Sequence, residues 1–235
     1  MTKLRVPESQ IGIVDKRVEE YVASLTPKSD PVLLDLEKDA ERRSIPIIGP
    51  LMARIITMIL KSTKHERALE IGTATGYSGI WIARSLQGDK RKLTTIEHDP
   101  QRRKEAQANF KKAGVDKYVE IMAGDARSVV PEIAKKNPGF FDLVFLDVGD
   151  KTLYVDLLND CIHALRVGGF LIADNTLWGW SVATPKGENP ETTTIPIRKF
   201  HKLVFSDKRL DAAIIPLRTA DSLPYGFTVA YKKKE

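Results

Sequence analysis

Short apolar runs alternate with amphipathic stretches from residue 67 onward. The runs read as buried strands, and the stretches between them repeat apolar residues at helical spacing. This alternation predicts a mostly parallel α/β sheet with helices on both faces. The expected strands are Ala68–Ile71, Leu93–Ile96, Tyr118–Met122, Phe141–Leu146 and Gly169–Ala173, and the expected helices lie near Ser78–Leu86, Pro100–Ala113, Ala126–Lys135 and Thr152–Leu165.

The first third of the chain has a helical pattern. Asp30-Pro31 resembles an N-cap followed by proline at the first helical position, leading Val32–Arg43. Leu51–Lys61 is a second, more apolar helix. A further helix is expected before these two, because apolar residues recur at helical spacing at Val14, Val18, Tyr21, Val22 and Leu25.

The last part of the chain begins with a loop rich in Pro, Gly and Thr, Trp178–Thr194. A helix at Ile197–Ser206 follows, and then two strands, Asp211–Leu217 and Gly226–Tyr231, which we expect to form an antiparallel edge. We therefore expect one domain over residues 1–235, with a helical cap over 1–62 and an α/β core over 63–235.

Composition is that of a globular protein, with 42% hydrophobic and 29% charged residues. The single cysteine, Cys161, excludes an intrachain disulfide and follows the apolar pattern of a core residue. Met1–Gln10 lacks the apolar run of a signal peptide, and Leu51–Leu60 is too short to span a bilayer. These features predict a soluble cytoplasmic protein that does not enter a membrane.

Net charge is +6, and the pI is about 9.3. A basic balance can mark a nucleic-acid partner. The basic residues are scattered, which favours a solvated surface, but the charge keeps an RNA substrate open as an alternative.

A turn containing two glycines follows the first expected strand, in Glu70-Ile-Gly-Thr-Ala-Thr-Gly-Tyr-Ser78. Gly72 and Gly76 permit a tight turn and a close approach to a ligand, and Ser78 can cap the next helix. In an open parallel sheet, ligands bind at the carboxyl ends of strands. The turn alone is a weak signal, because it lacks the third glycine of the dinucleotide motif.

Two further strand ends add to this signal. Glu97 follows the second strand, where an acid can accept hydrogen bonds from both ribose hydroxyls, although a solvated loop residue is the alternative. Asp125 follows the third strand, where we favour helix capping over an adenine contact. The backbone of Ala126 is a candidate adenine contact.

The fourth and fifth strands end in Asp147 and in Asp174-Asn175. If these strands are neighbours, two carboxylates and an amide oxygen converge at one rim, as a hard cation requires. The alternative is that Asp147 caps a helix and Asp174-Asn175 makes a turn. The combination with the cofactor pattern favours a metal site.

Together these motifs resemble the class I, S-adenosylmethionine-dependent methyltransferases. They are most similar to the metal-dependent O-methyltransferase family of catechol and caffeoyl-coenzyme A methyltransferases, from about Pro46 onward. The resemblance implies a Rossmann-like fold with a seven-stranded sheet and a homodimer. It implies a cation (Mg²⁺, with Ca²⁺ or Mn²⁺ as alternatives) at Asp147, Asp174 and Asn175. The implied S-adenosylmethionine contacts are Ile48, Glu70, Gly72, Thr73, Ser78, Glu97, Ala126 and Asp147.

In this family a lysine lies just after the first metal aspartate. Lys151 is therefore the candidate base or electrostatic partner, acting beside Asp147. One additional residue separates Asp147 from Lys151 here, so a solvated position at the start of a helix is the alternative. Trp178 and Trp180 are candidates for an aromatic wall, for core packing or for a dimer contact. Arg54 falls near the family's active site, or lies on a helix surface.

The sequence thus predicts metal-dependent O-methylation of a catechol-like or other vicinal hydroxyl on a small molecule. One alternative is the same chemistry on a hydroxylated tRNA base. Another is a non-catalytic module that binds S-adenosylmethionine. The N-terminal helices are expected to cover the acceptor site or to pair subunits.

Overall fold

The computed structural model describes residues 21–22, 24–27, 29–62, 64–178, 181–183, 193–217 and 225–235. They form a seven-stranded sheet in the order β3-β2-β1-β4-β5-β7-β6. The first five strands run parallel, and β7 pairs antiparallel with both β5 and β6. The strands are β1 Arg67–Ile71, β2 Lys92–Glu97, β3 Val119–Ala123, β4 Phe141–Leu146, β5 Leu165–Ala173, β6 Leu210–Leu217 and β7 Tyr225–Lys232.

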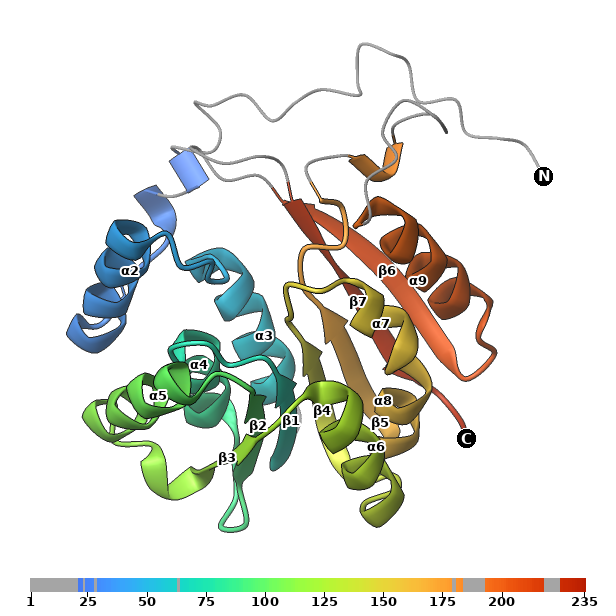
Figure 1. Cartoon of the computed structure of the whole chain (residues 1–235), viewed down its shortest axis with the longest axis horizontal. Coiled ribbons are helices and arrows are strands. Elements are labelled where there is room, and N and C mark those ends of the chain that lie inside the picture. The colour runs from blue at the N-terminus through green and yellow to red at the C-terminus, as the bar shows by residue number, and fades with distance from the viewer. Residues whose placement is uncertain are drawn as a thin grey trace.

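Helices cover both faces of this sheet (Figure 1). One face carries α3, α4 and α5, and the other carries α6, α7, α8 and α9. The strands alternate between the two cores, since Leu69 of β1 packs on the second face and Ala68 on the first. The helices are α2 Pro31–Arg43, α3 Pro50–Ser62, α4 Tyr77–Ser85, α5 Pro100–Lys112, α6 Ala126–Lys136, α7 Thr152–Asp156, α8 Leu158–Ala164 and α9 Thr194–Ser206.

Local chemistry explains where several helices begin. The carboxylate of Asp30 accepts hydrogen bonds from the backbone N–H of Val32 and Leu33, so the predicted cap of α2 is confirmed. Asp125 caps α6 in the same way, through the N–H of Arg127, and this prediction is also confirmed. Cys161 is fully buried, as its apolar pattern predicted.

Several predicted elements were wrong in their extent, among them the helix predicted at Ile197, which begins at Thr194. Thr152–Leu165 is divided into two helices, α7 and α8, at Leu157, which keeps a right-handed helical backbone with a φ of −97° and a ψ of −5°. The strand predicted at Gly169 begins earlier, at Leu165, with Gly168 at a φ of +84° inside it. The apolar pattern continues across Leu157, whereas Arg166, Gly168 and Gly169 interrupt it within β5, so the pattern marks neither boundary.

The order of the strands reverses between β1 and β4, since β2 lies on one side of this pair and β5 on the other. A crevice opens at such a switch point, beyond the carboxyl ends of the strands. Among the described residues, no helix has both the length and the apolar character needed to cross a membrane. The helical pattern expected before residue 21 lies outside the described residues.

Candidate functional site

A cavity of about 1360 Å³ lies at the switch point. Its floor is formed by the ends of β1, β2, β4 and β5 and by the residue pair before α6. The wall opposite includes the segment from Glu37 to Gly49, that is, α2 and its connection to α3. This part of the N-terminal region therefore lies against the cavity, and Ile48 is a buried part of the wall.

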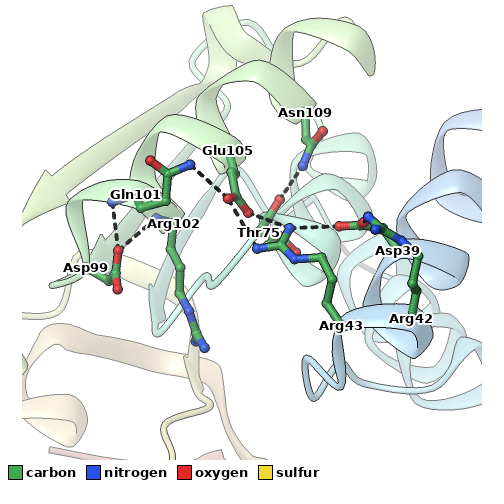
Figure 2. A network of polar contacts seen from close by, with 9 residues as sticks. All are labelled: Asp39, Arg42, Arg43, Thr75, Asp99, Gln101, Arg102, Glu105 and Asn109. Atoms are coloured by element: carbon green, nitrogen blue, oxygen red, sulfur yellow. Dashed lines mark hydrogen bonds and ion pairs between the residues drawn. The ribbon is translucent and has the colours of Figure 1, made fainter.

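The loop after β1 has a backbone that few residues can adopt. Gly72 and Gly76 both have a φ of +93°, and Ala74 between them has a φ of +47°. The N–H of Gly76 donates to the carbonyl of Thr73 at 2.8 Å, which closes the turn. Asn109 of α5 fixes the loop from outside, because its side-chain amide donates to the carbonyl of Thr75 at 2.9 Å (Figure 2).

Glu97 lies at the end of β2 with its carboxylate facing this loop. One carboxylate oxygen accepts a hydrogen bond from the N–H of Ala74 at 3.0 Å, and the other accepts from the N–H of Asp99 at 2.9 Å. Its side chain is 5% exposed and lines the cavity. Glu97 is thus a fixed acceptor and not a solvated loop residue, so the alternative from the sequence is wrong.

Glu70 lies beneath the loop and is fully buried. It accepts hydrogen bonds from Ser78 at 2.6 Å and from Thr95 at 2.7 Å. Burial raises the pKa of Glu70 to about 7, despite these hydrogen bonds. Glu70 does not line the cavity, so we infer that it supports the loop from below.

Ser78 has a different local role from the predicted one. The helix begins at Tyr77 with Gly76 at the N-cap, and Ser78 lies within the first turn. Its hydroxyl donates to Glu70, so the prediction that Ser78 caps α4 was wrong. Because Gly76 has a left-handed conformation and is the N-cap, the helix begins at Tyr77, before the serine. Ser78 still lines the cavity, as do Gly72, Thr73 and Ala126.

The ends of β1, β4 and β5 continue their hydrogen-bond ladder beyond the strands. The N–H of Asp147 donates to the carbonyl of Ile71, and the N–H of Asp174 donates to the carbonyl of Leu146, both at 3.0 Å. Asp147 and Asp174 therefore lie side by side on neighbouring strands, as the sequence predicted. Asn175 follows with a φ of +49°, a left-handed conformation that asparagine tolerates.

These side chains fit a hard cation in two respects. Asp174 Oδ1 and Asn175 Oδ1 are buried without a hydrogen-bond partner, which is costly unless another group binds them. The donor set of two carboxylates and one amide is that of Mg²⁺ or Ca²⁺. Within the described ranges no three His, Cys, Asp or Glu side chains gather as metal ligands, so the amide oxygen is needed to complete the set.

Burial governs the electrostatics of these acids. It raises the pKa of Asp174 to about 8, with a further contribution from the charge of Asp147. The pKa of Asp147 is also raised by burial, although the charge of Lys151 opposes the shift. Two adjacent carboxylates at this partly buried position are therefore expensive to ionise together unless positive charge lies beside them.

Lys151 lies against these acids and is only 4% exposed. Its Nζ donates to the carbonyl of Asp174 at 3.1 Å and to the hydroxyl of Tyr154. Burial lowers the pKa of Lys151. The alternative of a solvated lysine is therefore wrong, and Lys151 is part of the cavity wall.

The connection between Asp147 and Lys151 is held by a side chain of α6. The carboxylate of Asp150 accepts a hydrogen bond from the N–H of Thr152 at 3.0 Å and another from the guanidinium of Arg127 at 2.9 Å. Arg127 also donates to the hydroxyl of Thr152 at 2.7 Å. Asp150 thus anchors this connection, which brings Lys151 into contact with Asp174.

Other residues named from the sequence fall in different places. Trp178 lines the cavity, with Lys151 Nζ 5.9 Å from the centre of its ring, whereas Trp180 lies outside the described residues. Arg54 does not line the cavity: it donates to the carbonyl of Pro27 and stacks on Trp81 at 5.5 Å. Arg54 therefore joins α3 to the chain before α2.

Sequence reasoning missed the outer wall of the cavity. Glu37 and Glu41 of α2 belong to it, as do His98 and Arg102 beside Glu97. The position of His98 directly after a strand-end acid was an available signal. Nothing in the local pattern of α2 indicated that its acidic side chains would line a cavity built on distant strand ends.

Polar contacts hold α2 in this position. The hydroxyl of Tyr77 donates to Glu37 at 2.6 Å, and the guanidinium of Arg43 pairs with Glu105 of α5 at 2.9 Å. Figure 2 shows Arg43 between Asp39 of its own helix and Glu105, with Arg102 directed away from this network. The helix that covers the cavity is thus tied to both α4 and α5.

This strand order, with a glycine-containing loop and paired strand-end acids at its switch point, defines a Rossmann-like α/β protein with a ligand cleft. A family model described as O-methyltransferase matches residues 25–225. The chain therefore belongs to the O-methyltransferase family, as its motifs predicted, and it has the class I fold of S-adenosylmethionine-dependent methyltransferases.

The chain is similar to known proteins over most of its length. A caffeoyl-CoA O-methyltransferase of Stellaria longipes is 30% identical, over 86% of this chain and 87% of that protein. A catechol O-methyltransferase of Niastella koreensis is 28% identical, over 85% and 90%. The crystal structure of TomG, an O-methyltransferase of Streptomyces achromogenes in complex with SAM, has a TM-score of 0.83 and 26% identity, covering 95% of this chain and 100% of that one.

Proposed function

We propose that this enzyme transfers the methyl group of S-adenosylmethionine to a hydroxyl oxygen of a small acceptor with a catechol-like or other vicinal hydroxyl pair. The cofactor would lie along loop 72–76, with its ribose at Glu97 and its adenine at Ala126. The cofactor bound to TomG supports the donor. The names of the caffeoyl-CoA and catechol relatives support the acceptor class.

We further propose that Asp147, Asp174 and Asn175 hold a divalent cation, with Mg²⁺ as the first candidate. The observation that carries this proposal is the pair of buried oxygens, Asp174 Oδ1 and Asn175 Oδ1, that lack a hydrogen-bond partner. A bound cation supplies stabilisation of the acceptor oxyanion and orients the hydroxyl pair. A neutral hydroxyl is otherwise a poor nucleophile.

The chain's own residues would position the two substrates. The rigid turn at Gly72 and the fixed carboxylate of Glu97 orient the donor, and the covering segment around Ile48 excludes water. Lys151 would face the acceptor hydroxyl as a base or electrostatic partner, receiving its proton at Nζ. Holding the oxygen and the methyl group in line can contribute about 7–11 kcal/mol in well-oriented reactions.

The test is transfer of a labelled methyl group to a panel of catechols, coenzyme A thioesters and undermodified tRNA. We expect a catechol or related hydroxyl compound to be labelled, labelling to stop on chelation, and Mg²⁺ to restore it. Labelling of tRNA alone, with strong dependence on salt, would replace the acceptor class by the nucleic-acid alternative.

A parallel calorimetric titration with S-adenosylhomocysteine separates binding from catalysis. Binding without transfer to any acceptor, with or without Mg²⁺, would favour the non-catalytic module. Transfer that continues undiminished after thorough chelation would refute the proposed cation.

A further inference from the structure

Tyr154 lies on α7, three residues after Lys151, and its side chain is fully buried. Its ring packs edge-on against Phe200 of α9, with the ring centres 5.5 Å apart and an angle of 68° between the planes. Residues three apart in a helical turn face the same direction, which places Tyr154 and Lys151 on one side of α7. That side faces the ends of β4 and β5.

The hydroxyl of Tyr154 lies among polar groups of the backbone and of Lys151. It lies 3.0 Å from the carbonyl oxygen of Leu146 and 2.8 Å from the carbonyl oxygen of Asp174. It also accepts a hydrogen bond from Lys151 Nζ. A phenolic hydroxyl has one proton to donate and can accept in addition, so one carbonyl receives its proton while its lone pair binds the amine.

These contacts join the two strand ends that carry the proposed cation ligands. Leu146 directly precedes Asp147 at the end of β4, and Asp174 follows the end of β5. Lys151 Nζ donates to the same carbonyl oxygen of Asp174, at 3.1 Å. One buried hydroxyl thus fixes the position of Lys151 relative to both strands.

A lysine side chain has a flexible four-carbon stem, so its amine adopts many positions unless other groups hold it. Among the described residues, the hydrogen bonds of Lys151 Nζ go to a hydroxyl and a backbone carbonyl, and not to a carboxylate. The carboxylates of Asp147 and Asp174 therefore stay available to a ligand, while the amine is held beside them at the cavity wall.

We propose that Tyr154 is a positioning residue, whose hydroxyl holds the Lys151 amine at the acceptor end of the cavity. The proposal rests on the proposed function for the reaction that Lys151 serves, but the contact itself is independent of that reaction. Tyr154 does not line the cavity, so it acts through Lys151 and not on the acceptor.

The test compares wild type with Tyr154→Phe, which keeps the buried ring and removes the hydroxyl. Tyr231→Phe, at an exposed position of β7, is the matched control. With an acceptor found by the panel, we expect Tyr154→Phe to lower kcat by roughly 10- to 100-fold, the scale of a small misplacement, without changing the KM for S-adenosylmethionine. Tyr231→Phe should match wild type.

A double-mutant cycle separates positioning from general damage. If Tyr154 acts through Lys151, then Tyr154→Phe added to Lys151→Met should lower kcat no further than Lys151→Met alone. Full additivity of the two losses would overturn the proposal.

A second readout needs no activity. In lysine-labelled, ligand-free protein, the Cε order parameter of Lys151, assigned through Lys151→Met, should fall in Tyr154→Phe and stay unchanged in Tyr231→Phe. An unchanged order parameter in Tyr154→Phe overturns the proposal, as does a loosened Lys151 with unchanged kcat. If wild type methylates nothing, the proposed function fails, and the order parameter still decides whether Tyr154 holds Lys151.

Discussion

Gly72 and Asp147 approach so closely that a side chain at residue 72 would collide with the backbone of residue 147. A β-carbon built on Gly72 would lie 2.1 Å from the carbonyl oxygen of Asp147, and the φ of Gly72 is +93°. The proposed cofactor loop after β1 and the metal-ligand candidate after β4 therefore share one contact. Their spacing depends on the absence of a side chain at this position.

We predict that Gly72→Ala damages the cofactor loop and the strand end together, because Asp147 must move to admit the methyl group. Strain of this kind costs about 1–3 kcal/mol from the backbone conformation alone, and the collision adds to it. Calorimetric affinity for S-adenosylhomocysteine and the free energy of unfolding in urea should both fall. Gly114→Ala is the control, since Gly114 has a φ of +68° and nothing within 4 Å of the added carbon. Equal losses of affinity in the two variants would contradict the shared contact.

Glu70 should make stability depend on pH. Its pKa is about 7 in the folded protein against an ordinary value of 4.5. Below pH 4.5 it is protonated in both states; as pH rises toward 7, the unfolded chain loses this proton first, so the free energy of unfolding falls. Glu70→Gln should remove this loss. The difference in the free energy of unfolding between Glu70→Gln and wild type should therefore shift in favour of the variant by roughly 3 kcal/mol between pH values below 4.5 and pH values above 7. Urea unfolding across this range measures it, with Glu120→Gln on exposed β3 as the control. A difference between Glu70→Gln and wild type that is the same at all pH values would refute the assignment.

Asp142 should be a stabilising residue at the opposite end of the sheet. One of its carboxylate oxygens accepts from the N–H groups of Glu66 and Arg67, each at 2.8 Å, and the other pairs with Arg166. Asp142→Ala leaves these donors unsatisfied, so the free energy of unfolding should fall by about 2–4 kcal/mol. Affinity for S-adenosylhomocysteine should be unchanged, because the proposed cofactor cleft lies at the other ends of the strands.

The control for Asp142 is Asp211→Ala, which breaks the exposed ion pair with Lys233. Exposed pairs contribute about 0–1 kcal/mol, so this variant should resemble wild type in urea unfolding. If both variants lost the same stability, the role of Asp142 would be no more than that of a surface charge.

The sequence predicted best where burial is continuous. Phe141–Leu146 was predicted with the bounds that the structure has, because every residue in it is buried between two layers of helices. The Asp30 and Asp125 caps were predicted because capping depends on neighbours in the chain. Convergence of Asp147 with Asp174 also followed from sequence, since neighbouring parallel strands end at one edge.

What was missed depends on contacts between distant segments. Serine is a common N-cap residue, but α4 begins with the left-handed Gly76 as its N-cap. Ser78 therefore lies inside the helix, and its hydroxyl donates to Glu70. Lys151 could be read as solvated until its contact with the Asp174 carbonyl was known. Glu37 reaches the cavity because Tyr77 binds it across the fold, and no periodicity in α2 contains that information.

The proposed cation site is tested most directly by binding Mn²⁺ to the protein saturated with S-adenosylhomocysteine, followed by the loss of the free-ion electron paramagnetic resonance signal. Wild type should bind one ion that Mg²⁺ displaces. The Asp147→Asn/Asp174→Asn variant, studied at an S-adenosylhomocysteine concentration that saturates it because Asp147 is also a candidate cofactor contact, should retain its fold but lose the ion. Equal binding of Mn²⁺ by wild type and the double variant would contradict the placement of a cation at Asp147, Asp174 and Asn175.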